Sequence, residues 1–305
     1  MQVPIRLEFE QSKTHTPTPL YASPVVMFED HVFISQPSID SSGKHAILSY
    51  SIADDSWDTL PCLPLDIASF GLGCCGGRVV IAGGVANLSV VSDVYVFHKE
   101  SQRWKKSIPS MPMKLCHFTL IGHGSALAVV GGLDPSMYAV SSVYVYLGGK
   151  QEWYLVAPLP IALSGLSPVV IGDSCYLTGG FSKIYVPSKM VLSVSLSRLF
   201  DPRQKSGYMW KTLPDVPYLR STPALLGGAL IVVGGYTKQG DSLSVVGSVH
   251  AYSPQLQTWI EIGCLPIPRQ RPICITLPTG EVLVIGGKGS ESSTADTVWK
   301  ISLAF

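Results

Sequence analysis

The segment from Gly71 to Gly76 has the glycine spacing GxGxxG, which in dinucleotide-binding proteins lets the backbone approach a pyrophosphate closely. That use requires a strand before the glycines and a helix after them. Here the residues Arg78-Val79-Val80-Ile81 follow, and this short apolar run predicts a strand. We therefore interpret the segment as a glycine-rich tight hairpin between two strands and not as a nucleotide site.

The histidines and cysteines show none of the spacings typical of metal sites. The seven histidines contain no HExxH pattern, and the seven cysteines contain no CxxC pair. We therefore expect no catalytic constellation, no metal and no cofactor. An odd number of cysteines without such spacing also favours a reducing compartment, and we predict a cytoplasmic protein.

Cationic and aromatic side chains offer a different chemistry, which is the binding of a partner. A guanidinium group presents a planar fork that matches a carboxylate, and a tyrosine ring supplies apolar contact area. The candidate residues lie scattered between positions 114 and 271, so they can act together only if the fold brings them to one face. The candidates are Lys114, Tyr138, Tyr185, Arg220, Tyr236, Arg269 and Arg271.

A repeat of about 50 residues provides the elements that could position these side chains. Five Gly-Gly doublets close five short apolar runs that read as buried strands. Ten or more residues after most doublets comes a second strand with an aromatic residue, and a tryptophan follows nine residues later, as in Tyr95 to Trp104 and Tyr144 to Trp153. A proline-rich turn then leads to the next copy. The doublets are Gly83-Gly84, Gly131-Gly132, Gly179-Gly180, Gly234-Gly235 and Gly286-Gly287.

The spacing predicts a sixth copy and a closing strand. One period before Gly84 lies Gln36, with Trp57 at the expected later position, so a degenerate copy begins the series. The last copy ends after its third strand, and the alternating segment Ile5–Glu10 can supply the fourth, with Phe9 where other copies carry tryptophan. A sheet shared by both ends of the chain would leave no open edge in the ring.

This pattern resembles the kelch repeat, which has four hydrophobic residues, a Gly-Gly doublet and then a spaced tyrosine and tryptophan. The WD40 alternative requires a Trp-Asp pair in each copy, but Trp57-Asp58 is the only one in the sequence. The resemblance implies an all-β fold, namely a six-bladed β-propeller of kelch type with four-stranded antiparallel blades and an N-terminal strand that closes the last blade. We expect an insertion around Leu199–Gly207 to form an irregular loop. We predict a single domain over residues 1–305, with the closing strand at 4–11 and blades at about 20–61, 67–109, 115–158, 164–214, 220–263 and 270–305.

The alternating strand directions place the loops between second and third strands on the same face as the crossings between blades. We predict that this face binds a partner protein or peptide with acidic residues through the candidates named above. In kelch substrate adaptors of ubiquitin ligases, arginines that enter the inner strand grip acidic peptides, and Arg220, Arg269 and Arg271 resemble that position. The resemblance therefore implies a substrate-recognition or scaffold role, without the BTB part of such adaptors. Alternatively, the arginines only solvate the ends of the loops.

A second hypothesis is a propeller enzyme that acts at the mouth of the channel. Kelch-like enzymes include copper oxidases, sialic acid mutarotases and plant specifier proteins, but the ExxxDxxxH iron motif of the specifier proteins is absent from this sequence. His117 precedes an inner strand and could line the channel. We favour the interaction module over the enzyme.

Composition limits the remaining partners. The net charge of +1 excludes a broad basic surface for nucleic acid or anionic membrane, and 46% hydrophobic residues fit a well-buried globular chain. The longest apolar tract, Ala224–Val233, is too short to span a bilayer. We expect neither nucleic acid nor membrane binding, and a monomeric propeller.

Overall fold

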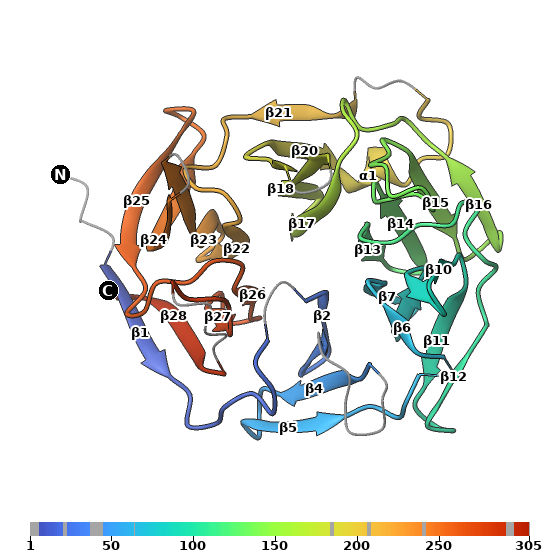
Figure 1. The fold of residues 1–305 in the computed structure, drawn as a ribbon, viewed down its shortest axis with the longest axis horizontal. Helices are drawn as coiled ribbons and strands as arrows, with labels where there is room; N and C mark the ends of the chain where they lie inside the picture. Colours follow the sequence, from blue (N-terminus) through green and yellow to red (C-terminus); the bar gives the residue numbers. More distant parts are fainter. Residues whose placement is uncertain are drawn as a thin grey trace.

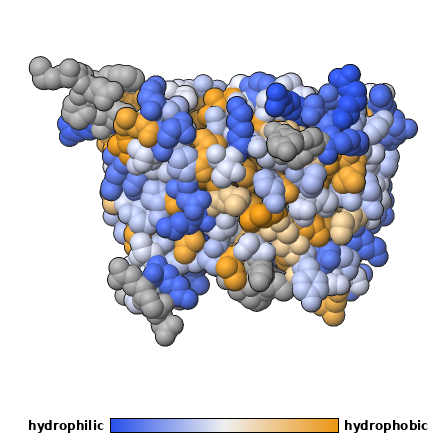
Figure 2. All heavy atoms as spheres, turned by 90° about the horizontal axis from the view of Figure 1, so that it is seen from above, coloured by the Kyte–Doolittle hydropathy of each residue, from blue (hydrophilic) through white to orange (hydrophobic). Residues whose placement is uncertain are grey.

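The computed structural model describes residues 6–20, 23–36, 45–63, 65–183, 186–205, 209–239, 242–290 and 296–304. Its strands form six antiparallel sheets, each with a path of four hydrogen-bonded strands, and these sheets stand as blades around a central channel (Figure 1). The predicted all-β propeller with four-stranded antiparallel blades is confirmed. In the side view the molecule is a thick disc with hydrophilic and hydrophobic side chains interspersed on its rim (Figure 2).

We number the blades 1 to 6 in chain order and give the strands from the channel outward. Blade 1 contains β2 (Val25–Phe28), β3 (His31–Ser35), β4 (Ile47–Ser51) and β5 (Ser56–Thr59). Blade 2 contains β7 (Gly71–Cys75), β8 (Arg78–Ala82), β11 (Val94–His98) and β12 (Arg103–Lys105). Blade 3 contains β13 (Thr119–His123), β14 (Ala126–Val130), β15 (Val143–Leu147) and β16 (Glu152–Leu155).

The other three blades follow the same order. Blade 4 contains β17 (Ser164–Ile171), β18 (Ser174–Lys183), β20 (Val191–Ser195) and β21 (Lys211–Leu213). Blade 5 contains β22 (Thr222–Leu226), β23 (Ala229–Gln239), β24 (Ser242–Ser253) and β25 (Thr258–Cys264). Blade 6 contains β26 (Ile273–Thr276), β27 (Val282–Ile285), β28 (Val298–Ala304) and β1 (Arg6–Gln11).

A few short strands and one helix lie outside the four-stranded paths of the blades. In blade 2, β9 (Val85–Ala86) forms a small sheet with β6 (Ile67–Ala68) on one side and β10 (Ser89–Val90) on the other. In blade 4, β19 (Val186–Pro187) pairs with the end of β18. The segment before the predicted insertion forms the single turn of helix α1 (Leu196–Leu199), so the departure from the repeat begins as a helix. No helix in the described parts of the chain has the length and hydrophobicity needed to span a bilayer.

The last blade contains strands from both ends of the chain. β1 pairs antiparallel with β28, and Phe9 lies opposite Ile301. In blade 3 the tryptophan Trp153 lies opposite Tyr146, at the equivalent position of the third strand. Phe9 therefore occupies the place of a blade tryptophan, as the alternation of residues 5–10 predicts.

The glycine doublets let neighbouring blades approach each other closely. All glycines of the five doublets have positive φ, a backbone conformation that residues other than glycine rarely adopt. A Cβ on Gly131 would lie 2.2 Å from the carbonyl oxygen of Leu163, which belongs to the crossing that enters blade 4. The adjacent Gly132 donates its N–H to the same oxygen at 2.9 Å. The doublet thus joins one blade to the next through backbone contact.

The same bond recurs around the ring. The backbone N–H of Gly84 donates to the carbonyl of Leu115, and that of Gly235 donates to the carbonyl of Arg269, each across a boundary between blades. Gly287 of blade 6 donates to Leu20, which precedes the first blade, at 2.8 Å. This last bond closes the ring.

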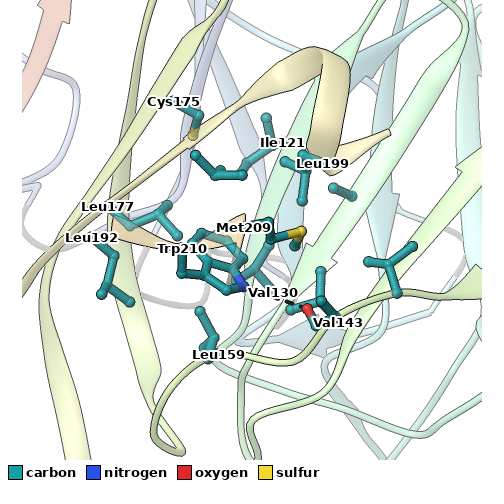
Figure 3. Close-up of a cluster of buried hydrophobic side chains, with 14 of the residues drawn as sticks. Ile121, Val130, Val143, Leu159, Cys175, Leu177, Leu192, Leu199, Met209 and Trp210 are labelled. Atoms are coloured by element: carbon teal, nitrogen blue, oxygen red, sulfur yellow. Dashed lines mark hydrogen bonds between the residues drawn. The ribbon is translucent and has the colours of Figure 1, made fainter. Parts of the chain in front are cut away.

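Apolar side chains fill the spaces between blades. The largest cluster joins blade 3, which contributes Ile121 and Val143, to blade 4, which contributes Leu177 and Leu192 (Figure 3). Trp210 also lies in this cluster and donates its indole N–H to the carbonyl of Ala157 at 3.4 Å. The tryptophans are therefore parts of the core between blades.

One sequence interpretation changes in detail. The glycines Gly71 and Gly73 do not form a hairpin turn but lie within the inner strand β7, and the turn itself is Gly76-Gly77. A Cβ on Gly71 would lie 2.5 Å from the ring of Phe118 in blade 3. A Cβ on Gly73 would lie 3.1 Å from the side chain of Leu120, also in blade 3. Side chains of the neighbouring blade therefore occupy the space beside both glycines, a cause that the local pattern does not reveal.

Candidate functional site

A ring of residues with left-handed backbone surrounds one mouth of the channel. These residues lie at or just before the start of the inner strands of blades 2 to 6, at the same position of the repeat, and have φ between 51° and 61°; they are Ser69, His117, Gly165, Arg220 and Arg271. Backbone hydrogen bonds link members of the ring. The N–H of His117 donates to the carbonyl of Ser69, that of Gly165 to the carbonyl of His117, and that of Arg271 to the carbonyl of Arg220. These bonds fix the backbone of the ring, so the side chains start from defined places.

The ring opens into a cavity of about 530 Å³ along the channel, lined mainly by the inner strands of the blades. The His117 side chain is open to this space. Desolvation by the surrounding walls, together with the positive charge of Arg271, lowers the pKa of His117. Its imidazole is therefore neutral at neutral pH and acts as a hydrogen-bonding group.

Two arginines of the ring converge on one aromatic side chain. The guanidinium carbon of Arg220 lies 5.0 Å from the ring centroid of Phe181, and that of Arg271 lies 6.0 Å from the same centroid. Arg220 also lies 5.7 Å from the ring centroid of Tyr236. Aromatic faces attract cations and hold their planes in place. Blades 4, 5 and 6 thus build one cationic and aromatic cluster.

Beside this cluster lies a pocket of about 220 Å³ whose charged lining residues are all cations. Arg220, Arg271 and Lys288 line it together with Tyr236, Gln270 and Leu243, and none of these described lining residues carries a carboxylate. The Nε atom of Arg220 is buried and has no hydrogen-bond acceptor among the described residues. A buried donor without an acceptor is unfavourable, so the pocket is suited to a ligand that brings negative charge.

The structure brings together three of the predicted partner-binding residues, Arg220, Arg271 and Tyr236. Arg269 is instead buried, with only 9% of its surface exposed, and its carbonyl accepts the N–H of Gly235. Burial lowers the pKa of Arg269. Lys114 and Tyr138 are exposed on the loops of blades 2 and 3 and do not line the pocket.

Tyr185 lies outside the described residues. Sequence reasoning missed Phe181, whose ring contacts the guanidinium groups of both arginines. A signal was present, because Phe181 directly follows the doublet Gly179-Gly180 as Tyr236 follows Gly234-Gly235. The position after the doublet pairs with the crossing to the inner strand, as the bridge between Leu219 and Tyr236 shows.

Within the described ranges, no group of three or more histidine, cysteine or acidic side chains could hold a metal ion. His45 and Gln36 also line the channel cavity, but His45 contacts Asp66 through its Nδ1 at 2.7 Å. The chemistry that these residues offer is hydrogen bonding and charge recognition.

Comparison with known families matches residues 67–112, which cover most of blade 2, to the Kelch motif. Among curated proteins, the chain is 26% identical over 255 residues to Kelch-like protein 35 of Mus musculus, a match that covers 82% of this chain and 40% of that protein. It is 28% identical over 240 residues to Kelch-like protein 25 of Homo sapiens, covering 74% of this chain and 37% of that protein. The chain therefore spans about two fifths of the length of the curated relatives it matches.

A solved structure, that of YjhT, has the same fold with a TM-score of 0.77 at 17% identity, over 95% of this chain and 99% of that one. The motif, the relatives and the blades define the class of the protein, a kelch-repeat β-propeller. The resemblance that the glycine doublets and tryptophans predict is confirmed.

Proposed function

We propose that this propeller is a protein-interaction module that binds an acidic segment of a partner protein at the channel mouth. The observation that carries the proposal is the convergence of Arg220 and Arg271 on Phe181, beside a pocket without a carboxylate among its described lining residues. Two planar cations in one partly buried place match the bidentate geometry of carboxylates.

The backbone at these arginines supports the proposal. Both have positive φ, 55° for Arg220 and 52° for Arg271, at a repeat position where blade 4 carries Gly165. Glycine adopts this conformation without strain, whereas arginine does not. Strained residues that a fold retains are concentrated at functional sites. The two side chains therefore occupy positions that the scaffold alone would fill better with glycine.

The surroundings strengthen any ion pair formed there. Arg220 and Arg271 are half-buried, and Phe181 and Tyr236 cover part of their planes. Charges that are shielded from water attract each other more strongly than charges on an open surface. The same shielding makes the interaction selective, because an uncharged segment leaves the buried Nε of Arg220 without an acceptor among the described residues.

A peptide array tests this function. It contains acidic peptides, each paired with a counterpart in which Gln and Asn replace Glu and Asp. We expect acidic peptides to bind and their counterparts to bind about 10-fold or more weakly. We expect replacement of Arg220 and Arg271 by Glu to abolish binding. Arg78→Glu, a charge reversal at the exposed first residue of β8 on the opposite face, should preserve it. Equal binding of acidic and amide peptides, or retention of binding by the double variant, would refute the proposal.

Several finer statements belong to the same proposal. Arg269, Lys114, Tyr138 and Tyr185 contribute further partner contacts, and the role is substrate recognition or scaffolding. We also propose that residues 1–305 form one domain, that the propeller is monomeric and that it acts in the cytoplasm. Size-exclusion chromatography with light scattering and imaging of the tagged protein test the last two statements.

An enzyme at the channel mouth is the second candidate. The channel cavity of about 530 Å³ and the neutral His117 at its mouth favour it. Elemental analysis of the purified protein and small-molecule turnover assays on wild type and His117→Gln test this alternative. Turnover that the substitution abolishes would support the enzyme.

A further inference from the structure

Blades 2 and 3 carry exposed apolar side chains on the same face, away from the arginines. Leu88 is fully exposed at the tip of the hairpin between β9 and β10, and Tyr138 is 71% exposed on the equivalent loop of blade 3. Met137, beside Tyr138, is also exposed. We call Leu88, Met137 and Tyr138 the apolar shelf.

Two members of the apolar shelf hold conformations that favour glycine. Asn87 and Leu88 form a two-residue hairpin with φ of 49° and 59°, the signature of a type I′ turn, whose second position prefers glycine. Met137 has φ of 63°. Each loop therefore places a large apolar side chain in solvent where glycine would suit the backbone better. Neither burial in this chain nor the turn explains these choices.

The loops that carry the apolar shelf are well ordered by their own contacts. The Oδ1 atom of Asp134 accepts the backbone N–H groups of Ser136 and Tyr138 at 2.9 and 3.0 Å. Below the loops, Val90 of blade 2 packs with Cys116 and Leu133 of blade 3 in one buried cluster. The loops that carry the shelf are thus ordered and are joined at their bases by one buried cluster across two blades.

The charged side chains around the shelf differ from those around the arginine pocket. The acids near the shelf are engaged within the chain, since Asp134 caps its own loop and Asp93 pairs with Lys106 at 2.9 Å. On the other side of the ring, blades 5 and 6 carry Arg220, Arg271 and Lys288. The blades that carry the apolar shelf and the blades that carry the cationic pocket thus lie on opposite sides of the channel (Figure 1).

We infer that the partner segment has two parts, acidic residues for the arginine pocket and aliphatic or aromatic residues that bind the apolar shelf of blades 2 and 3. This inference rests on the proposed function, because the acidic part is the ligand proposed there. Charge complementarity sets the orientation, with the acidic part over blades 5 and 6. A segment with only one of the two parts would leave half of the prepared surface unused.

The test selects short random peptides from a display library on the intact wild-type chain and measures the affinity of the enriched peptides by fluorescence polarisation. The double variant Leu88→Gly/Met137→Gly removes two of the three side chains of the shelf and leaves Tyr138 in place, and it preserves folding because glycine suits both backbones. Arg220→Ala removes part of the arginine pocket. Leu256→Ala is the matched control, since Leu256 is an exposed leucine in the loop between β24 and β25 on the opposite face.

We expect enriched peptides with separate acidic and apolar residues, which bind the double glycine variant about 10-fold more weakly and the Leu256→Ala control unchanged. Peptides that depend on Arg220 but bind the double variant equally would overturn this inference and leave the proposed function standing. Peptides that depend on neither the shelf nor the arginine pocket, or no peptides at all, would overturn both. Dimerisation of the wild type that the double glycine variant abolishes, seen by sedimentation, would assign the shelf to a second copy and also overturn the inference.

Discussion

The indole Nε1 of Trp153 donates a hydrogen bond to the carbonyl oxygen of Pro109 at 2.9 Å, across the boundary between blades 3 and 2. Trp104 and Trp259 make the same bond to Pro61 and Pro214. The repeated tryptophan therefore ties its outer strand to the proline-rich crossing that leads in from the preceding blade.

Replacement of Trp153 tests this tie. We expect Trp153→Phe to lower the free energy of unfolding by about 1 kcal/mol, because the apolar contacts largely remain while the Pro109 carbonyl loses its donor. Trp153→Ala should cost about 3 kcal/mol, the lower end for such truncations, since the side chain is only half-buried. Urea denaturation measures both.

Trp57 is the matched control, because its Nε1 is buried without an acceptor among the described residues. Trp57→Phe removes an unsatisfied donor and should leave stability unchanged or raise it. An equal loss for Trp57→Phe and Trp153→Phe would show that the hydrogen bond contributes nothing.

The glycine doublets give a second prediction. A Cβ on Gly234 would lie 2.1 Å from the carbonyl oxygen of Arg269, whereas a Cβ on Gly76 would meet nothing within 4 Å. Both residues have positive φ, so both alanine variants lose about 1–2 kcal/mol through backbone strain. Gly234→Ala should lose clearly more, because blade 6 must also move away. Thermal melts of both variants that coincide would contradict the close contact between the blades.

Stability should fall in mild acid because of His250. This histidine is buried, its Nδ1 lacks an acceptor among the described residues, and Tyr218 packs against its ring at 5.5 Å. Burial lowers the pKa of His250 below its ordinary value of 6.5, although Glu261 acts in the opposite direction. The unfolded chain therefore binds the proton more readily than the folded chain. Stability that is present above pH 6.5 is lost as the pH falls through the folded pKa.

His117 has a lowered pKa for similar reasons and adds to this loss. Replacing His250 by tyrosine, the residue at the equivalent positions 95 and 144, should reduce the difference between urea midpoints measured at pH 7.5 and at pH 5. His98→Tyr, a substitution of a partly exposed histidine in blade 2, serves as the control. An unchanged pH dependence in His250→Tyr would assign the acid sensitivity to other groups.

Phe181 should act on partner binding through the arginines. Phe181→Leu keeps an apolar side chain but removes the ring that faces Arg220 and Arg271. We expect acidic peptides to bind the variant about 5-fold more weakly, because each of the two cation–π contacts contributes roughly 0.5 kcal/mol. Phe200→Leu, whose ring stacks on His123 in another part of the molecule, should bind as the wild type does. Identical affinities for both variants would remove Phe181 from the site.

Much of this architecture can be predicted from the sequence because each copy of the repeat carries the same pattern of residues at the same spacing. The interval between doublets locates the blades, and the alternation of residues 5–10 places Phe9 opposite Ile301. The glycines of β7 show the opposite case. Their cause is the side chains of Phe118 and Leu120 in the next blade, and a contact between blades has no trace in local spacing.

Part of the candidate site can be predicted from the sequence and part of it cannot. Arg220 and Arg271 precede their inner strands at one repeat position, so their common location is readable from the sequence. Arg269 lies only two residues before Arg271, yet it is buried. Only the path of the crossing, with the Arg269 carbonyl held by Gly235, decides which arginine faces the pocket. Residue type alone could not separate them.

The pairing of β1 with β28 has a consequence for synthesis on the ribosome. Arg6–Gln11 emerges first, but its partner Val298–Ala304 is made at the other end of the chain. Blades 1 to 5 can assemble as they emerge, while the first strand waits with its edge exposed. Completion of the ring is therefore the last step in the assembly of the propeller itself, and a nascent chain stalled before Val298 would present an unpaired strand to chaperones.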